Sequence, residues 1–119
     1  MCIRDRLTAA ADGGPATVPG DPRQTRDLLF VDDAVDALVR AGTRGSGLVV
    51  NVGTGVQTAL RDLHRFCAGD GAPPPLSGPA EVGAPARFAL SPVRARIHLG
   101  WAPWTSLPDG LAVVRRSLP

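Results

Sequence analysis

Among the residues that could do chemistry, Arg26 has the most informative position. It lies in the turn-rich stretch Gly20–Asp27, directly before the apolar run Leu28–Val31. An arginine at the end of a buried strand can hold a phosphate through two parallel hydrogen bonds, because the planar guanidinium matches two phosphate oxygens. The residues alone favour a surface pair between Arg26 and a neighbouring aspartate just as strongly.

Two absent residue types limit the catalysis that this chain can perform. Its 119 residues include no Tyr and no Lys, so all 13 basic residues are Arg. These absences exclude a Schiff-base lysine, the lysine of a nucleotide P-loop and any Tyr–Lys proton-transfer pair. We therefore assign no catalytic residue to the chain and predict that most catalytic machinery lies elsewhere.

The charge pattern and the cysteine positions limit what this chain is expected to bind. The net charge is +2, and the arginines are scattered with few aromatic residues between them. This pattern lacks the basic face of a nucleic-acid-binding protein, and the apolar runs are too short to span a bilayer. Neither nucleic acid nor a membrane is therefore expected as a partner. Cys2 and Cys67 are far apart and form no metal-ligand cluster with the two His residues. The composition favours a reducing cytoplasm.

The hydrophobic pattern predicts an α/β fold with a strand–helix–strand unit. Residues 1–15 carry little signal and form an unassigned head, whereas residues 16–119 are expected to form one substrate-binding region. Continuous apolar runs predict buried strands at Leu28–Val31 and Leu48–Val52. Such a unit cannot cover its own sheet faces, so the chain is expected to be one end of a larger protein.

Four helices are predicted from apolar spacings of three and four residues and from their capping residues. The first begins at Asp32-Asp33, carries the apolar stripe Val35, Leu38 and Val39, and ends at Gly42 with the left-handed cap that glycine allows. The other three are expected to begin after Thr58, Ser91 and Ser106, with Gly100 ending the third. The spacing places His64 and His98 on helix surfaces and Cys67 in the core.

Four blocks in order resemble one enzyme family. Gly20-Asp-Pro-Arg-Gln24-Thr-Arg26-Asp27, with the following Leu-Leu-Phe-Val-Asp-Asp33, resembles the Gly-Asp-Gly-x-Gln-Thr-Arg-Asp-Phe-x-(Tyr/Phe)-Val-x-Asp segment of NAD-dependent sugar nucleotide epimerases and dehydratases. These are extended short-chain dehydrogenase/reductases. The other three blocks are Leu48–Gly55, Thr58–Leu63 and Arg94–Leu111. Together they resemble roughly the last third of such an enzyme.

The resemblance implies that much of the enzyme lies outside this chain. In this family an N-terminal Rossmann domain binds NAD through a Gly-rich loop, and a Tyr-x-x-x-Lys pair acts on the sugar. This chain contains no such pair. The resemblance thus implies a C-terminal fragment of a Rossmann-type enzyme with a small substrate-binding lobe. NAD would be bound mainly by the missing domain, and a homodimer would form through the missing part.

The same resemblance implies a nucleotide-sugar site on this chain. Arg26 matches the family arginine that contacts the diphosphate, and Thr17, Val18 and Pro19 match the segment whose backbone lies near the base. A second phosphate-binding arginine of the family aligns with Glu81, which inverts the charge, and Arg87 can take its place.

Several alternatives accompany this interpretation. The chain can belong to a non-catalytic nucleotide-sugar-binding protein of the same fold, or to a reductase-type relative. The turn Asn51–Gly55 is favoured as a structural turn over a phosphate loop. Trp101 and Trp104 are expected to pack the C-terminal helix, with a base-stacking platform as the alternative.

Overall fold

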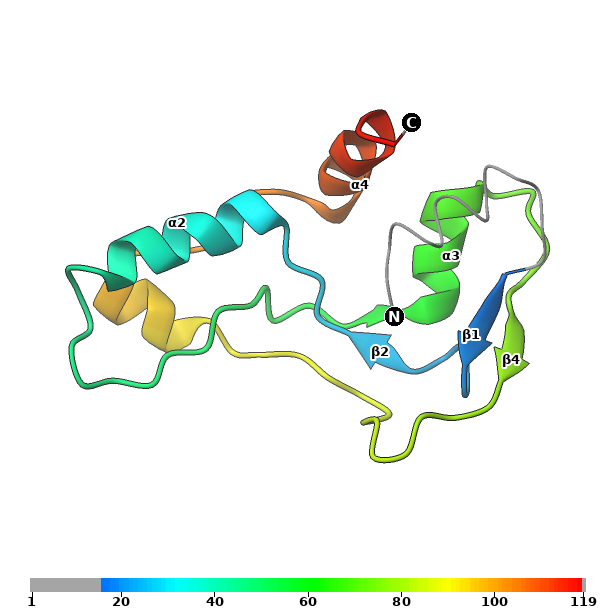
Figure 1. Cartoon of the computed structure of the whole chain (residues 1–119), viewed down its shortest axis with the longest axis horizontal. Helices are drawn as coiled ribbons and strands as arrows, with labels where there is room; N and C mark the ends of the chain where they lie inside the picture. Colours follow the sequence, from blue (N-terminus) through cyan, green and yellow to red (C-terminus); the bar gives the residue numbers. More distant parts are fainter. Residues whose placement is uncertain (1–15, 119) are drawn as a thin grey trace.

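The computed structural model describes residues 16–118, which contain short strands and four helical segments (Figure 1). The unassigned head 1–15 lies outside the described residues. In chain order the elements are β1 (Thr17–Pro19), β2 (Thr25–Arg26), α2 (Val31–Ala41), β3 (Thr58–Ala59), α3 (Leu60–Ala68), β4 (Leu76–Gly78), the π-helix η1 (Ala95–Leu99) and α4 (Leu107–Arg116).

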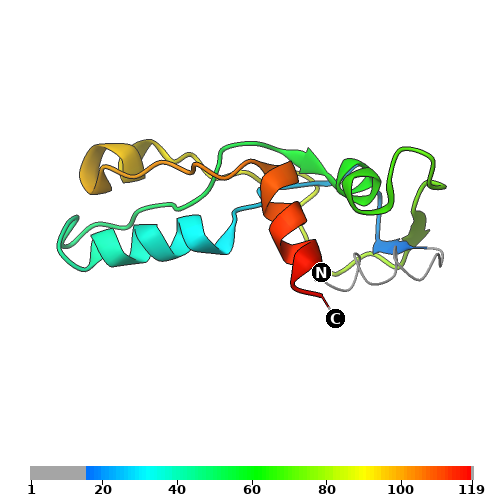
Figure 2. The ribbon, with the colours of Figure 1, turned by 90° about the horizontal axis from the view of Figure 1, so that it is seen from above.

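The elements form two groups with α4 between them (Figures 1 and 2). At one end α2 lies beside η1, and at the other α3 lies near the pair β1–β4. β1 and β4 are parallel, with Val18 opposite Ser77, whereas β2 and β3 are antiparallel, with Arg26 opposite Thr58. The α/β class is therefore confirmed. Across residues 16–118, no helix has both the length and the hydropathy that crossing a membrane requires.

The two predicted strands of the strand–helix–strand unit are wrong for the described residues. Leu28–Phe30 and Leu48–Val52 are irregular, and Val31 already belongs to α2. A strand requires a neighbour that accepts and donates its backbone hydrogen bonds, and within residues 16–118 neither segment has one. Val49 is accordingly 82% exposed. The strands that do form are short and pair other segments.

The helices at α2, α3 and α4 are confirmed, and their ends test the capping rules. Ser106 accepts a hydrogen bond from the Asp109 N–H, and η1 ends at Gly100 as predicted, with a left-handed φ of 61°. The end of α2 at Gly42 is confirmed, but the left-handed geometry predicted there is wrong, because the φ of Gly42 is −62°.

The predicted N-terminal caps of α2 and α3 are also wrong. Phe30 and Ala59 occupy those positions without a side-chain cap hydrogen bond. Thr58 lies in β3 instead, and Asp33 lies within the first turn of α2.

Two small cores hold the described residues together. The first joins β1, α3 and α4 and includes Cys67 as predicted; its buried members are Val18, Leu60, Leu63, Cys67 and Leu111. The second joins α2 and η1; its buried members are Ala37, Ala95, Leu99 and Trp101. The predicted role of the tryptophans is therefore wrong. Trp101 packs beside α2, where its Nε1 donates to the Asp33 carbonyl at 2.9 Å, and Trp104 is 60% exposed.

The apolar stripe of α2 faces solvent. Val35, Leu38 and Val39 are 50%, 71% and 69% exposed, whereas Asp33 and Ala37 on another face of the helix are buried. This arrangement is the reverse of an amphipathic helix packed on its own core. The stripe is thus an apolar surface that no described residue covers.

Candidate functional site

Three segments meet around β2, where Arg26 lies. β2 pairs with β3 on one edge, and residues 85–88 run along it on another side. The Thr25 N–H donates to the Ala86 carbonyl at 3.0 Å, and the Phe88 N–H donates to Thr25 Oγ1 at 3.3 Å. These bonds bring the segment that carries Arg87 next to the strand that carries Arg26.

The Arg26 guanidinium is held by three acceptors of this framework. Its Nη1 donates to the carbonyls of Thr25 and Pro85 at 2.8 and 2.9 Å, and its Nη2 donates to Gln24 Oε1 at 2.7 Å. A guanidinium has five N–H donors, so the Nε–H and one Nη2 hydrogen have no acceptor among the described residues. Two such donors are what a phosphate needs for a bidentate contact.

The alternative pairing of Arg26 with a neighbouring aspartate does not occur among residues 16–118. Asp21 pairs with Arg23 at 2.8 Å, and hydrogen bonds from Arg23 hold the pKa of Asp21 below its usual value. Asp27 points its carboxylate to the turn at Thr54. The structure therefore leaves the positive charge of Arg26 without a described carboxylate partner.

The predicted base-binding segment coincides with β1. Val18 is fully buried and belongs to the first core, so only its backbone can face a ligand. Thr17 is exposed, and Pro19 is half-buried with its carbonyl accepting a hydrogen bond from Gln24 Nε2. Of these three residues only Pro19 lines a hollow, which Gln24 also lines.

That hollow has a volume of about 160 Å³ and is bordered by both acidic and apolar groups. Its lining residues are Pro19, Gly20, Asp21, Gln24, Ala80, Glu81, Ala84 and Ala86. Glu81 therefore lies across this hollow from Pro19, the last residue of β1. Arg87 is exposed on the adjoining segment and does not line the hollow.

The turn after Val52 is structural, as favoured by the sequence. The carboxylate of Asp27 accepts hydrogen bonds from the N–H groups of Thr54, Gly55 and Leu90 at 3.0–3.1 Å, and also from Thr54 Oγ1. The donors that a phosphate loop would offer are therefore occupied by protein. This turn is accordingly not assigned to a phosphate.

The predicted surface position of His64 is wrong, whereas His98 is exposed as expected. His64 is only 6% exposed, because the segment after α3 folds back and the Pro73 carbonyl lies 3.0 Å from its Nε2. Within residues 16–118 no three His, Cys, Asp or Glu side chains gather in a way that could hold a metal ion.

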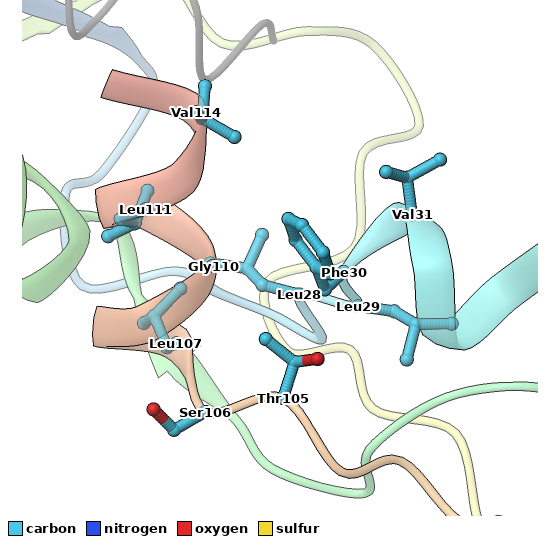
Figure 3. A pocket seen from close by; sticks show the side chains of 10 residues that line it. All are labelled: Leu28, Leu29, Phe30, Val31, Thr105, Ser106, Leu107, Gly110, Leu111 and Val114. Carbon is cyan, nitrogen blue, oxygen red and sulfur yellow. The ribbon is translucent and has the colours of Figure 1, made fainter. Parts of the chain in front are cut away.

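An apolar hollow of about 210 Å³ separates α4 from the segment before α2. Figure 3 shows Leu28 and Phe30 on one side and Leu107, Leu111 and Val114 on the other. The two hydroxyls in its lining are already engaged, since Thr105 donates to Asp33 and Ser106 donates to Asp109. This hollow consequently offers packing space rather than chemistry.

Sequence reasoning missed two residues that organise the site, Gln24 and Asp27. Both belong to the motif that contains Arg26, but their partners lie 5 and 27 residues away, at Pro19 and Thr54. Spacing along the chain carries no signal for such contacts. Their place in the same short motif as Arg26 was the only sequence feature that could have indicated a role in the site.

Comparisons with known proteins agree on one enzyme family. Residues 2–53 match the model of the NAD dependent epimerase/dehydratase family. The chain is 48% identical over 103 residues to UDP-glucose 4-epimerase of Mycolicibacterium smegmatis, an alignment that covers 84% of this chain and 33% of the relative. This chain spans about a third of the length of the curated relatives it matches.

Solved structures show the same arrangement of elements. A UDP-glucose 4-epimerase of Thermotoga maritima, solved with UDP-glucose, is 28% identical with a TM-score of 0.87 and covers 96% of this chain and 38% of its own. MoeE5 in complex with UDP-glucose and NAD is 28% identical with a TM-score of 0.86, covering 98% of this chain and 40% of its own.

Proposed function

Because the chain belongs to the NAD-dependent epimerase/dehydratase family, we propose that it forms the nucleotide-sugar-binding C-terminal part of a larger enzyme. The observation that carries the proposal is the Arg26 guanidinium, fixed by three acceptors with two donors left for an anion. The parent reaction would be transient oxidation of a sugar nucleotide followed by epimerisation or dehydration. In that reaction this chain holds and orients the nucleotide.

The site residues divide by the part of the nucleotide that they would contact. Arg26 would bind the diphosphate, and Arg87 would supply a second positive charge from the adjoining segment 85–88, which is hydrogen-bonded to β2. The backbone of Thr17, Val18 and Pro19 would lie near the base. NAD and the homodimer contacts would belong to the missing part, in a cytoplasmic enzyme.

A second candidate function is nucleotide-sugar binding without catalysis. Glu81 favours it, because a carboxylate lines the hollow where a phosphate-binding arginine was expected. A hybrid protein separates the two functions. In this hybrid the full 119-residue chain replaces the matching third of the Mycolicibacterium smegmatis relative. Turnover of UDP-glucose by the hybrid supports the enzyme, whereas nucleotide binding without turnover supports the binding protein.

We expect the chain by itself to lack a cooperative thermal transition and to bind the dye ANS. The reason is the exposed stripe Val35, Leu38 and Val39 on α2, which a missing Rossmann domain would cover. Differential scanning calorimetry and dye fluorescence measure both properties. The hybrid should unfold cooperatively and bind little dye. A sharp transition of the isolated chain without dye binding would contradict the proposal that a further domain covers this stripe.

Arg26→Ala should weaken binding of UDP-glucose to the hybrid by about 10- to 100-fold, because each charge-assisted hydrogen bond is worth roughly 1.5–3 kcal/mol. Arg26→Lys should restore only part of the affinity, since an ammonium cannot form the bidentate contact. Titration calorimetry measures the three proteins. Arg116→Ala, an exposed arginine on α4, is the matched control and should bind like the unmodified hybrid. Unchanged affinity of Arg26→Ala would remove this arginine from the site.

A further inference from the structure

Each of the four polar atoms of Gln24 makes a hydrogen bond to the framework of the site. Its backbone N–H donates to the Asp21 carbonyl at 3.1 Å, and its carbonyl accepts from the Leu60 N–H at 3.0 Å, at the start of α3. Its side-chain Nε2 donates to the Pro19 carbonyl, and its Oε1 accepts from Arg26 Nη2 at 2.7 Å. The amide therefore connects the end of β1 to the guanidinium.

This arrangement fixes which way the amide points. A carbonyl can only accept and a guanidinium can only donate, so the Pro19 carbonyl requires the NH₂ end and Arg26 requires the oxygen end. Since α3 and the turn hold the Gln24 backbone, the side chain has little freedom to follow Arg26 if that residue moves. Gln24 consequently restrains one Nη2 hydrogen and leaves the second, with the Nε–H, for a ligand.

We propose that Gln24 is a positioning residue that sets the orientation of Arg26 toward a nucleotide diphosphate and ties that orientation to β1. The inference rests on the proposed nucleotide-sugar function. Gln24 does not touch the phosphate and acts through Arg26. Because the same amide holds the Pro19 carbonyl, the diphosphate contact and the segment proposed to lie near the base keep a fixed relation to each other.

The test is a double-mutant cycle in the hybrid protein with UDP as the probe. Gln24→Met keeps a side chain of similar length without either hydrogen bond. It should weaken UDP binding by about 3- to 10-fold, the value of the one lost bond that holds Arg26. In the Arg26→Ala background the same change should alter affinity by less than about twofold, because residues that act as one unit are not additive. Calorimetric titration of the four proteins gives the coupling.

Controls distinguish positioning from general damage. Gln57→Met removes another amide beside β2, one that accepts from Thr25 Oγ1 at 2.9 Å, and should leave UDP affinity unchanged. Thermal unfolding of Gln24→Met should show a folded protein. A structural role alone would weaken UDP binding equally with and without Arg26, and this additivity would overturn the proposal, as would unchanged affinity of Gln24→Met. If Arg26→Ala itself binds UDP normally, the proposed function fails instead.

Discussion

Replacing Asp33 by alanine is expected to lower the free energy of unfolding of the hybrid by about 3–5 kcal/mol. Three partly buried donors lose their acceptor, and a fully buried donor without an acceptor costs about 1–3 kcal/mol. The Asp33 side chain is fully buried. Its Oδ2 accepts from the N–H groups of Trp104 and Thr105 at 3.0 and 2.9 Å, and its Oδ1 accepts from Thr105 Oγ1 at 2.6 Å. Alanine would leave all three donors without this acceptor.

Urea unfolding of the hybrid measures this loss, and two further variants calibrate it. Asp33→Asn keeps one acceptor oxygen and should lose about half as much stability. Asp32→Ala removes an exposed carboxylate from the same first turn of α2, so only its helix-dipole interaction is lost, about 0.3–1 kcal/mol. Equal losses for Asp32→Ala and Asp33→Ala would show that the buried bonds contribute little.

Asp33 also shows where local sequence rules stop. An aspartate at the start of an apolar stripe predicts a helix cap, and the helix was predicted correctly. Its carboxylate instead binds residues 71 and 72 positions later, a distance that no local pattern reports. By contrast, the Ser106 cap and the helix end at Gly100 depend on residues within five positions and were predicted correctly.

The same reasoning explains the strands and the candidate site. Leu48–Val52 has the composition of a strand, but a strand depends on a neighbour, and none lies within residues 16–118. The position of Arg26 followed from a motif, whereas its environment depends on Pro85, 59 residues away. Motifs thus located the candidate site, and tertiary contacts determine which donors remain for a ligand.

Asp27→Asn is expected to destabilise the hybrid by about 1.5–3 kcal/mol at pH 7, the value of a hydrogen bond to a charged group. The carboxylate joins β2 to the turn at Thr54 and to the backbone at Leu90. An asparagine would place its NH₂ group, itself a donor, against some of the N–H groups that donate to the carboxylate. Asp62→Asn, which changes a half-buried aspartate 3.8 Å from Arg61, is the matched control and should have little effect.

Gly53→Ala tests the same junction by crowding instead of charge. A Cβ at this position would lie 2.8 Å from Asp27 Oδ2 and 2.8 Å from the Leu90 Cβ. Neither neighbour is the end of a long flexible side chain, so the junction must shift. Thermal unfolding should show a loss for Gly53→Ala, whereas Gly71→Ala, with open space around the added Cβ, should show little.

The contribution of Asp27 should disappear in acid. Burial raises the pKa of this carboxyl, but hydrogen bonds from Thr54, Leu90 and Gly55 outweigh burial and hold the pKa below its ordinary value. A lowered folded-state pKa stabilises the protein above the unfolded value, and that stability is lost as the pH falls through the folded value. The difference in melting temperature between the unmodified hybrid and Asp27→Asn should therefore be constant from pH 7 to 5 and shrink below about pH 4. Other carboxylates titrate in both proteins and cancel in this difference. A difference that persists unchanged at pH 3 would show that the charge of Asp27 does not hold the junction.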